Sequence, residues 1–108
     1  MTVQIVRAVL VCVLLCGTNP AKADVAAGRA KANACAVCHG ELGISTLPNA
    51  PNLAGQPEFY LTEQMKAYRS GRRPNEIMSI IAKPLTDAEI ADLSAWFASI
   101  AIEAKPPK

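Results

Sequence analysis

Three residues whose side chains can hold a metal-containing group stand close together, at Cys35, Cys38 and His39. Thiols at this spacing lie about one helical turn apart, so both can reach the two vinyl groups of one porphyrin. An imidazole on the next residue then lies under the ring, where it can bind the iron. This Cys-x-x-Cys-His pattern is typical of c-type haem attachment, and it predicts one covalently bound haem c per chain.

Other uses of these residues remain open but fit less well. A thioredoxin-like dithiol would need a βαβ context, which the sequence lacks. A structural zinc site needs about four ligands, whereas the chain has a single histidine. A plain disulfide between Cys35 and Cys38 would close only a very short loop and constrain little of the chain.

A second axial ligand must come from a methionine, because there is no other histidine. Met65 falls on the apolar face of an expected helix and reads as a core residue. Met78 lies in an expected irregular segment between Pro74 and Pro84, and we predict that it is the sixth ligand of the iron. The alternative for Met78 is a core residue below an open iron.

The imidazole that binds iron needs an acceptor for its other ring N–H, which sets the tautomer and the ring orientation. The carbonyl of Pro51 is the best candidate, and a simple turn residue is the alternative. A local basic cluster of four residues has two interpretations. It is either a solvated face or a partner for a haem propionate or an acidic protein, with the last two members favoured: Lys66, Arg69, Arg72 and Arg73.

The N-terminal segment has the organisation of a signal peptide. Residues 1–7 carry the positive charge, residues 8–16 are apolar, and Ala21-Lys22-Ala23 is an A-x-A cleavage site. The apolar run is about half of the ~20 residues that cross a bilayer, which argues against stable membrane insertion. We therefore expect residues 1–23 to be a cleaved signal peptide, residues 24–108 to be a single domain, and the mature protein to be periplasmic.

The composition of the expected mature chain excludes some partners. Loss of Arg7 and Lys22 leaves nine basic and nine acidic residues, so the formal charge of +2 falls to zero. A nucleic-acid-binding protein would show a marked basic excess, so we expect no nucleic-acid partner. A domain this small usually needs a staple, a metal or a cofactor to complete its core.

The elements that position these residues are expected to be helices, because no stretch alternates like a strand. We expect helices over 24–35 and 57–69, a short helical turn over 76–82, and a wrapping loop over 40–56. The clearest helix follows the capping box that begins at Thr86. Its core-facing stripe has Trp96 beside it and consists of Ile90, Leu93, Phe97 and Ile100.

Together these residues resemble the class I c-type cytochromes, and most of all the small bacterial periplasmic monohaem members and the single-haem halves of dihaem relatives. The similarity runs from about Ala26 to Ile100. It rests on residues 33–40 (NACAVCHG), 51–56 (PNLAGQ), 60–61, 64–65, 68, 71–72, 78, 85–86 and 90–97 (IADLSAWF). The resemblance implies an all-α cytochrome c fold in which three to four helices wrap one haem and the N- and C-terminal helices cross.

The resemblance also implies roles for single residues. Cys35 and Cys38 would form the thioethers, and His39 and Met78 would be the axial ligands. The carbonyl of Pro51 would bind the histidine. Leu53 would pack on the haem, and Gly28 would permit the helix crossing against Leu93 and Trp96. The chain departs from the pattern at Ile81, where relatives often carry a second methionine, and at Ala32, where they often carry an aromatic residue.

The function implied is electron transfer between redox protein partners, not enzymatic catalysis. The chain would act as a monomer or as a subunit of a redox complex. Two alternatives remain: a permanent electron-transfer subunit of a dehydrogenase or oxidase, and a haem enzyme or gas sensor with an open iron.

Overall fold

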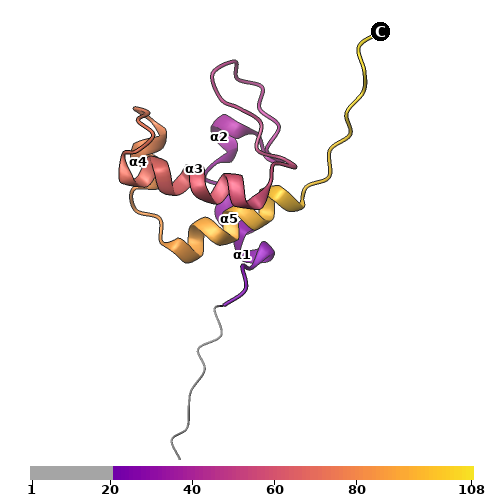
Figure 1. Ribbon diagram of the computed structural model, residues 1–108. Helices are drawn as coiled ribbons and strands as arrows, with labels where there is room; N and C mark the ends of the chain where they lie inside the picture. Colours follow the sequence, from indigo (N-terminus) through magenta and orange to yellow (C-terminus); the bar gives the residue numbers. More distant parts are fainter. Residues whose placement is uncertain (1–20) are drawn as a thin grey trace, which may run out of the picture.

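The computed structural model describes residues 21–108, so most of the expected signal peptide lies outside the described residues. Within this part of the chain every regular element is helical, which confirms the all-α prediction (Figure 1). The five helices are α1 (Val25–Ala32), α2 (Ala36–His39), α3 (Glu58–Ser70), α4 (Met78–Ala82) and α5 (Asp87–Ser99). The short α4 corresponds to the helical turn expected over 76–82, and only α2 is an element beyond those expected.

The helix ends follow from local side-chain chemistry. At α1, the Asp24 carboxylate accepts hydrogen bonds from the backbone N–H groups of Ala26 and Ala27. At α5, Thr86 and Glu89 form the expected capping box, in which each side chain accepts from the other's backbone N–H. Gly71 ends α3 in the left-handed conformation.

The first expected helix, over 24–35, is interrupted. α1 ends at Ala32, and a turn in which the Cys35 N–H donates to the Ala32 carbonyl (2.9 Å) precedes α2. Asn33, a poor helix former, caps the end of α1, so the helix stops three residues before the expected end at Cys35 although the flanking alanines favour helix. The loop over 40–56 is present as expected.

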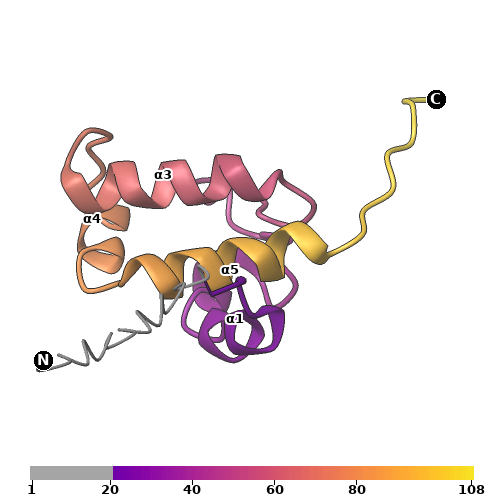
Figure 2. The ribbon, with the colours of Figure 1, turned by 60° about the horizontal axis from the view of Figure 1, so that its bottom comes forward.

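α1 and α5 cross at close range, as the resemblance implied, and α3 runs beside α5 (Figure 2). A Cβ atom on Gly28 would lie 1.9 Å from the Asp92 carbonyl oxygen and 2.9 Å from the Cβ of Trp96. The helix backbones therefore meet at Asp92, and Leu93 is not among the three nearest contacts. The space between them admits only glycine, which explains this residue in a helix interior.

The buried core lies between α1, α3 and α5. It is formed by Ala32, Leu61, Leu93 and Phe97, with Leu53 and Trp96 partly buried against it. Ala32 stands where relatives often carry an aromatic residue, and its small side chain is buried in this core. None of the helices in the described part is long and apolar enough to cross a membrane.

Candidate functional site

His39 is held in a fixed orientation at the end of α2. Its side chain is buried, with a residue exposure of 7%. Its Nδ1 lies 2.7 Å from the carbonyl oxygen of Pro51, the acceptor that the sequence suggested. A carbonyl can only accept, so Nδ1 carries the proton and donates it, which leaves the lone pair of Nε2 available to a metal.

The two cysteines precede this histidine on the same helical turn. Both thiols are free and half-buried, so the structure does not join them in a disulfide. Burial raises the pKa of the Cys35 thiol, as does the neighbouring Cys38, while Lys31 opposes the effect. Cys35 also packs against the core. Cys35 therefore lies where its sulfur would meet the apolar edge of a group packed on this core.

A zinc site finds no support in the geometry. Nowhere in residues 21–108 do three or more His, Cys, Asp or Glu side chains gather closely enough to hold an ion. The cysteines and His39 therefore lack the fourth ligand, and the carboxylates, that a structural zinc would require.

The loop that carries Pro51 is tied back to α2 by two residues that sequence reasoning missed. The Ser45 hydroxyl donates to the Cys38 carbonyl at 2.8 Å, and the Ser45 N–H donates to the Asn52 side-chain oxygen at 2.7 Å. These bonds fix the loop on both sides of its turn. Asn and Ser are typical of such loop bonds, but the sequence does not show which backbone groups they reach.

Gly40 permits the chain to turn directly after His39. It has a φ of +80°, and a Cβ there would lie 2.0 Å from the carbonyl oxygen of Ile44. Only glycine combines this conformation with such a close approach. The turn returns the loop across α2, which is how a carbonyl twelve residues further on reaches the imidazole.

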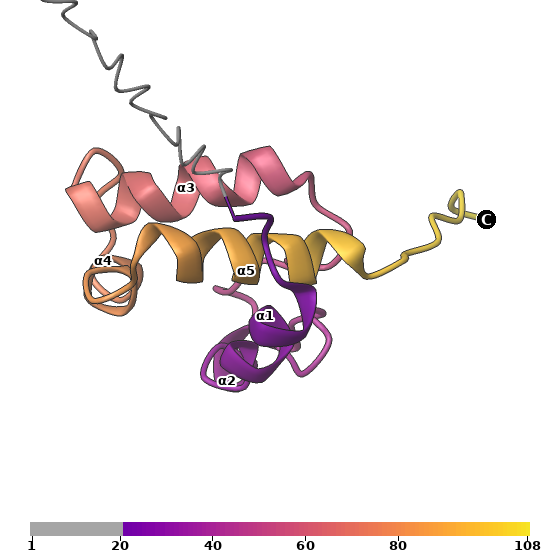
Figure 3. The same ribbon diagram turned by 90° about the horizontal axis from the view of Figure 1, so that it is seen from below.

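Met78 is the first residue of α4, so it belongs to the short helical turn expected over 76–82 and not to the irregular part of the segment between Pro74 and Pro84. Asn75 sets this start: its side-chain oxygen accepts from the Met78 N–H at 2.8 Å, and its own N–H donates to the Ser79 hydroxyl at 3.2 Å. Met78 is partly buried. α4 and α2 lie on the same side of α5, separated along its length (Figure 3).

Large apolar side chains on the loop and on α4 remain uncovered by the polypeptide. On the loop they are Leu42 (55% exposed), Ile44 (50%) and Leu47 (42%), and at α4 they are Ile77 (59%), directly before the helix, with Ile80 (72%) and Ile81 (46%) on it. A small domain gains little by leaving such side chains in water, and these six come from the two segments that carry Pro51 and Met78. An apolar plate of the size of a porphyrin fits what these segments lack, and the donor set of two thiols, imidazole and thioether fits haem c.

Leu53 and Met65, for which the sequence predicted a haem contact and a core position respectively, lie in different elements: Leu53 in the loop and Met65 in α3. Leu53 lies directly after Asn52 and packs against the buried core, next to the loop end that carries Pro51. Met65 is partly buried in the middle of α3. Neither position excludes the roles expected of them, a haem contact for Leu53 and a core residue for Met65.

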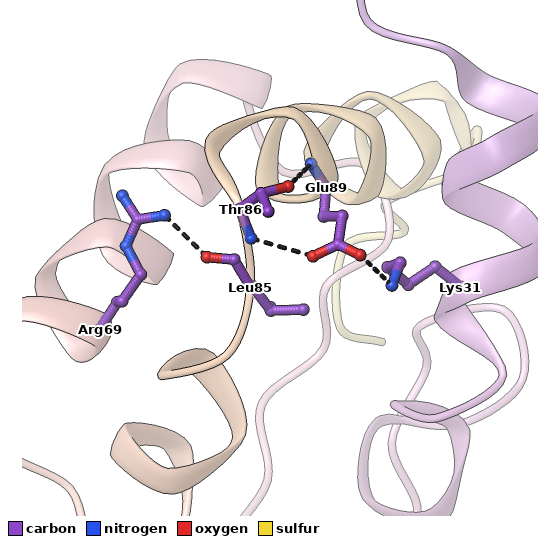
Figure 4. Close-up of polar contacts among 5 residues, drawn as sticks. All are labelled: Lys31, Arg69, Leu85, Thr86 and Glu89. Atoms are coloured by element: carbon purple, nitrogen blue, oxygen red, sulfur yellow. Dashed lines mark hydrogen bonds and ion pairs between the residues drawn. The ribbon is translucent and has the colours of Figure 1, made fainter.

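The basic cluster does not converge on one point. Arg69 donates to the Leu85 carbonyl at 2.8 Å (Figure 4). It also pairs with the Asp87 carboxylate. Arg73 donates to the Gln64 side chain and lies over the ring of Tyr68, 4.7 Å from its centroid. Arg72 contacts Ser70 and is exposed. Three of the four cations thus contact partners within the fold.

Comparison with known proteins gives a consistent result. Residues 25–101 match the family model of cytochrome c. The chain is 46% identical over 85 residues to cytochrome c4 of Pseudomonas aeruginosa, which covers 79% of this chain and 42% of that protein. It is 42% identical over 79 residues to cytochrome c-554(548) of Halomonas halodenitrificans, which covers 70% of this chain and 95% of that protein.

A solved structure supports the same arrangement. The thiosulfate dehydrogenase of Marichromatium purpuratum contains a similar segment, with a TM-score of 0.68 and 36% identity, covering 82% of this chain and 23% of that one. The chain spans less than half the length of the cytochrome c4 that it matches, but nearly all of the cytochrome c-554(548). The similarity therefore concerns one cytochrome c domain.

Proposed function

Because this chain belongs to the cytochrome c family, we propose that it is an exported electron carrier whose haem c is held by Cys35, Cys38, His39 and Met78. The two thiols would attach the porphyrin, and the imidazole and the thioether would bind the iron from opposite sides. Pro51 and Leu53 would support the group, one through the histidine and the other through apolar contact.

The observation that carries the proposal is the hydrogen bond between His39 Nδ1 and the Pro51 carbonyl. A buried histidine held by one nitrogen, with two free thiols on the turn before it, is arranged as an axial ligand. A histidine that served only the core would not need the cysteines beside it.

The bound haem supplies the one-electron Fe(III)/Fe(II) couple. The chain's own residues orient and protect it. The Pro51 carbonyl holds the His39 ring in one tautomer and one orientation. Asn75 fixes the backbone of Met78 at the start of α4. A neutral thioether favours the reduced iron relative to a second imidazole, which raises the potential. With His39 and Met78 both bound to it, the iron would have no position open to water or a substrate.

The ligand assignment is tested by replacing each methionine in turn. Met78→Ala should convert the visible and EPR spectra from low-spin to high-spin, because one axial position is lost. Met65→Ala is the matched control: it removes the same side chain from α3 and should keep the low-spin spectrum. A low-spin Met78→Ala protein would overturn the assignment.

The periplasmic location is part of the proposal. It is supported by the A-x-A pattern that ends at Ala23 and by the need for thioether formation outside the cytoplasm's reducing conditions. The partners are other redox proteins that meet the molecule through a small transient surface. Cell fractionation of the full-length chain, followed by haem staining, checks the location.

A second candidate is an electron-transfer subunit bound permanently to a dehydrogenase. The similarity to a segment of a thiosulfate dehydrogenase structure favours this possibility over an open-iron enzyme. A permanent subunit should co-purify with a larger partner at high salt, whereas a free carrier should elute alone. Carbon monoxide should leave the spectrum of either unchanged, and a ready shift would instead indicate an open iron.

A further inference from the structure

The backbone nitrogen of Asp24 contacts a carboxylate far away in the sequence. It donates a hydrogen bond of 2.7 Å to Oδ1 of Asp92 on α5, a residue 68 positions further along the chain. Asp24 is also the residue that directly follows the expected cleavage site. The group that would become the new amino terminus therefore already faces an anionic partner in the folded domain.

Both ends of this contact are fixed independently of it. The Asp24 carboxylate accepts from the N–H groups of Ala26 and Ala27, and its carbonyl accepts from Gly28 at 2.9 Å. The backbone of Asp92 is pressed against Gly28, one turn into α1. Since Gly28 sets the approach of the two helices, the Asp92 side chain has little freedom to move away from the Asp24 nitrogen.

We infer that Asp92 is the binding site for the α-ammonium group of the mature chain. The inference rests on the export proposed above, and it adds a role for processing: cleavage after Ala23 completes the α1–α5 crossing. Before cleavage the nitrogen is a neutral amide that donates one hydrogen bond. After cleavage it is a cation next to a carboxylate.

The chemistry of this step balances with water as the co-reactant and a signal peptidase as the catalyst. The amide bond between the Ala23 carbonyl carbon and the Asp24 nitrogen breaks, and the water oxygen becomes part of the Ala23 carboxylate. The nitrogen retains its hydrogen and takes up the two from water, which leaves an ammonium. A cation at the positive end of a helix is unfavourable by itself, and the carboxylates of Asp24 and Asp92 offset this cost.

Cleavage at any other position would not give this arrangement. A longer mature chain would keep the Asp24 nitrogen as an amide, and a shorter one would remove the cap of α1. The A-x-A pattern and the position of Asp92 therefore both indicate cleavage of the bond between Ala23 and Asp24, and they do so for independent reasons.

The same crossing contains a suitable control. Lys31 on α1 and Glu89 on α5 form an ion pair at 2.5 Å that does not involve the terminus. Its strength should not depend on how the N-terminus is processed. Loss of this pair through Glu89→Gln measures the general effect of removing a carboxylate from α5.

The experiment is a thermodynamic cycle on the purified, haem-containing protein. One chain begins at Asp24, and a second carries a serine inserted after Ala23, so that the ammonium moves out by one residue. Each is made with and without Asp92→Asn, and intact mass establishes the terminus. In the chain that begins at Asp24 the substitution should lower Tm by about 3 °C, and in the extended chain by about 1 °C. In about 1 M salt the difference should shrink, because the Debye length falls to about 3 Å.

The outcomes separate this inference from the proposals it builds on. A protein that retains residues 1–23 would overturn both the export and this inference. A mature terminus at Asp24 with equal Tm losses in the two chains would overturn the inference alone, leaving the export intact. If Asp92→Asn protein does not fold, the inserted serine by itself should lower Tm, and Glu89→Gln should cost the same in both chains.

Discussion

The two sides of this small domain differ in how far the polypeptide completes them. At the crossing of α1 and α5, the apolar residues of α5 are almost fully covered: Ile90 is 0% exposed, and Leu93 and Phe97 are each 4% exposed. The crossing is also joined by polar contacts between Lys31 and Glu89 and between Asp24 and Asp92. On this side the large apolar side chains of α5 that face the core have partners within the chain.

The side formed by the loop over 40–56 and by α4 lacks such partners. Large apolar residues on this side are each more than 40% exposed: Ile44 and Leu47 on the loop, Ile77 directly before α4, and Ile81 on α4. The loop is instead ordered by hydrogen bonds, such as those of Ser45 and of His39 with Pro51. Protein side chains therefore cover one side of the core by themselves, and the other side needs the haem to cover its apolar residues.

The largest effect should come from removing the attachment of the haem. Cys35→Ser together with Cys38→Ser leaves no thiol for a thioether, so the haem should be extractable with acidified solvent. Because one side of the domain then has nothing to pack on, the haem-free protein should lose more than half of its far-UV helical signal. Serine is nearly isosteric with cysteine, so packing alone does not account for the loss. A colourless double variant that keeps its full helical signal would refute the comparison.

The next largest effect should come from the crossing. Gly28→Ala places a methyl group within 2 Å of the Asp92 carbonyl, so the helices must separate, and stability should fall by about 3 kcal/mol. The measurement is urea unfolding of the haem-containing protein followed by circular dichroism.

Gly71→Ala is the control for this change. Gly71 has a φ of +83° but no atom within 4 Å of its Cβ position, so alanine costs only backbone strain, about 1 kcal/mol. Equal losses for the two variants would show that close helix approach is not what Gly28 provides.

A smaller effect should come from the cap of α5. Thr86→Ala removes the acceptor for the Glu89 N–H and should lower stability by about 1 kcal/mol, or Tm by about 4–8 °C. Thr86→Ser retains the hydroxyl and should restore most of the loss. Differential scanning calorimetry measures both. A serine variant as unstable as the alanine variant would assign the effect to the lost methyl group.

The smallest effect should be on acid stability at the same helix end. A hydrogen bond from Lys31 lowers the pKa of Glu89, and a hydrogen bond from Arg69 lowers that of Asp87. A depressed folded-state pKa gives stability that is present above the unfolded value and lost as pH falls through the folded value. The wild-type Tm should therefore drop between about pH 5 and pH 3, and Glu89→Gln should flatten that drop. Glu103→Gln, in the exposed tail, is the control and should leave the pH profile unchanged.

Much of the site could be predicted from the sequence because its chemistry depends on residue type and short spacing. Two thiols and an imidazole within one turn specify the haem attachment, and the capping box specifies where α5 begins. The acceptor for His39 was also suggested, and the hydrogen bond to Pro51 is present. Each of these interactions lies within one element or within a short loop.

What the sequence could not show involves contacts between distant segments or competition between equal local preferences. The break between α1 and α2 falls at Asn33, a weak stop signal within alanine-rich sequence, so the sequence did not show where the first helix ends. The bond from Asn75 to the Met78 N–H is local and was overlooked, whereas the bond of Ser45 to the Cys38 carbonyl depends on where the loop returns. The basic cluster looked like one surface, yet Arg69 turns to Asp87, because its charge partner is on another helix.

The sequence alone determined that the chain is helical and that it is built for a covalent haem, and it named candidate residues for that group, since those properties depend on side-chain type and local periodicity. Only the tertiary structure decided that α1 meets α5 at Gly28 and Asp92, and that the Asp24 nitrogen faces the Asp92 carboxylate. Such contacts join residues more than sixty positions apart, and no local preference specifies them. They follow from the packing of helix surfaces against one another.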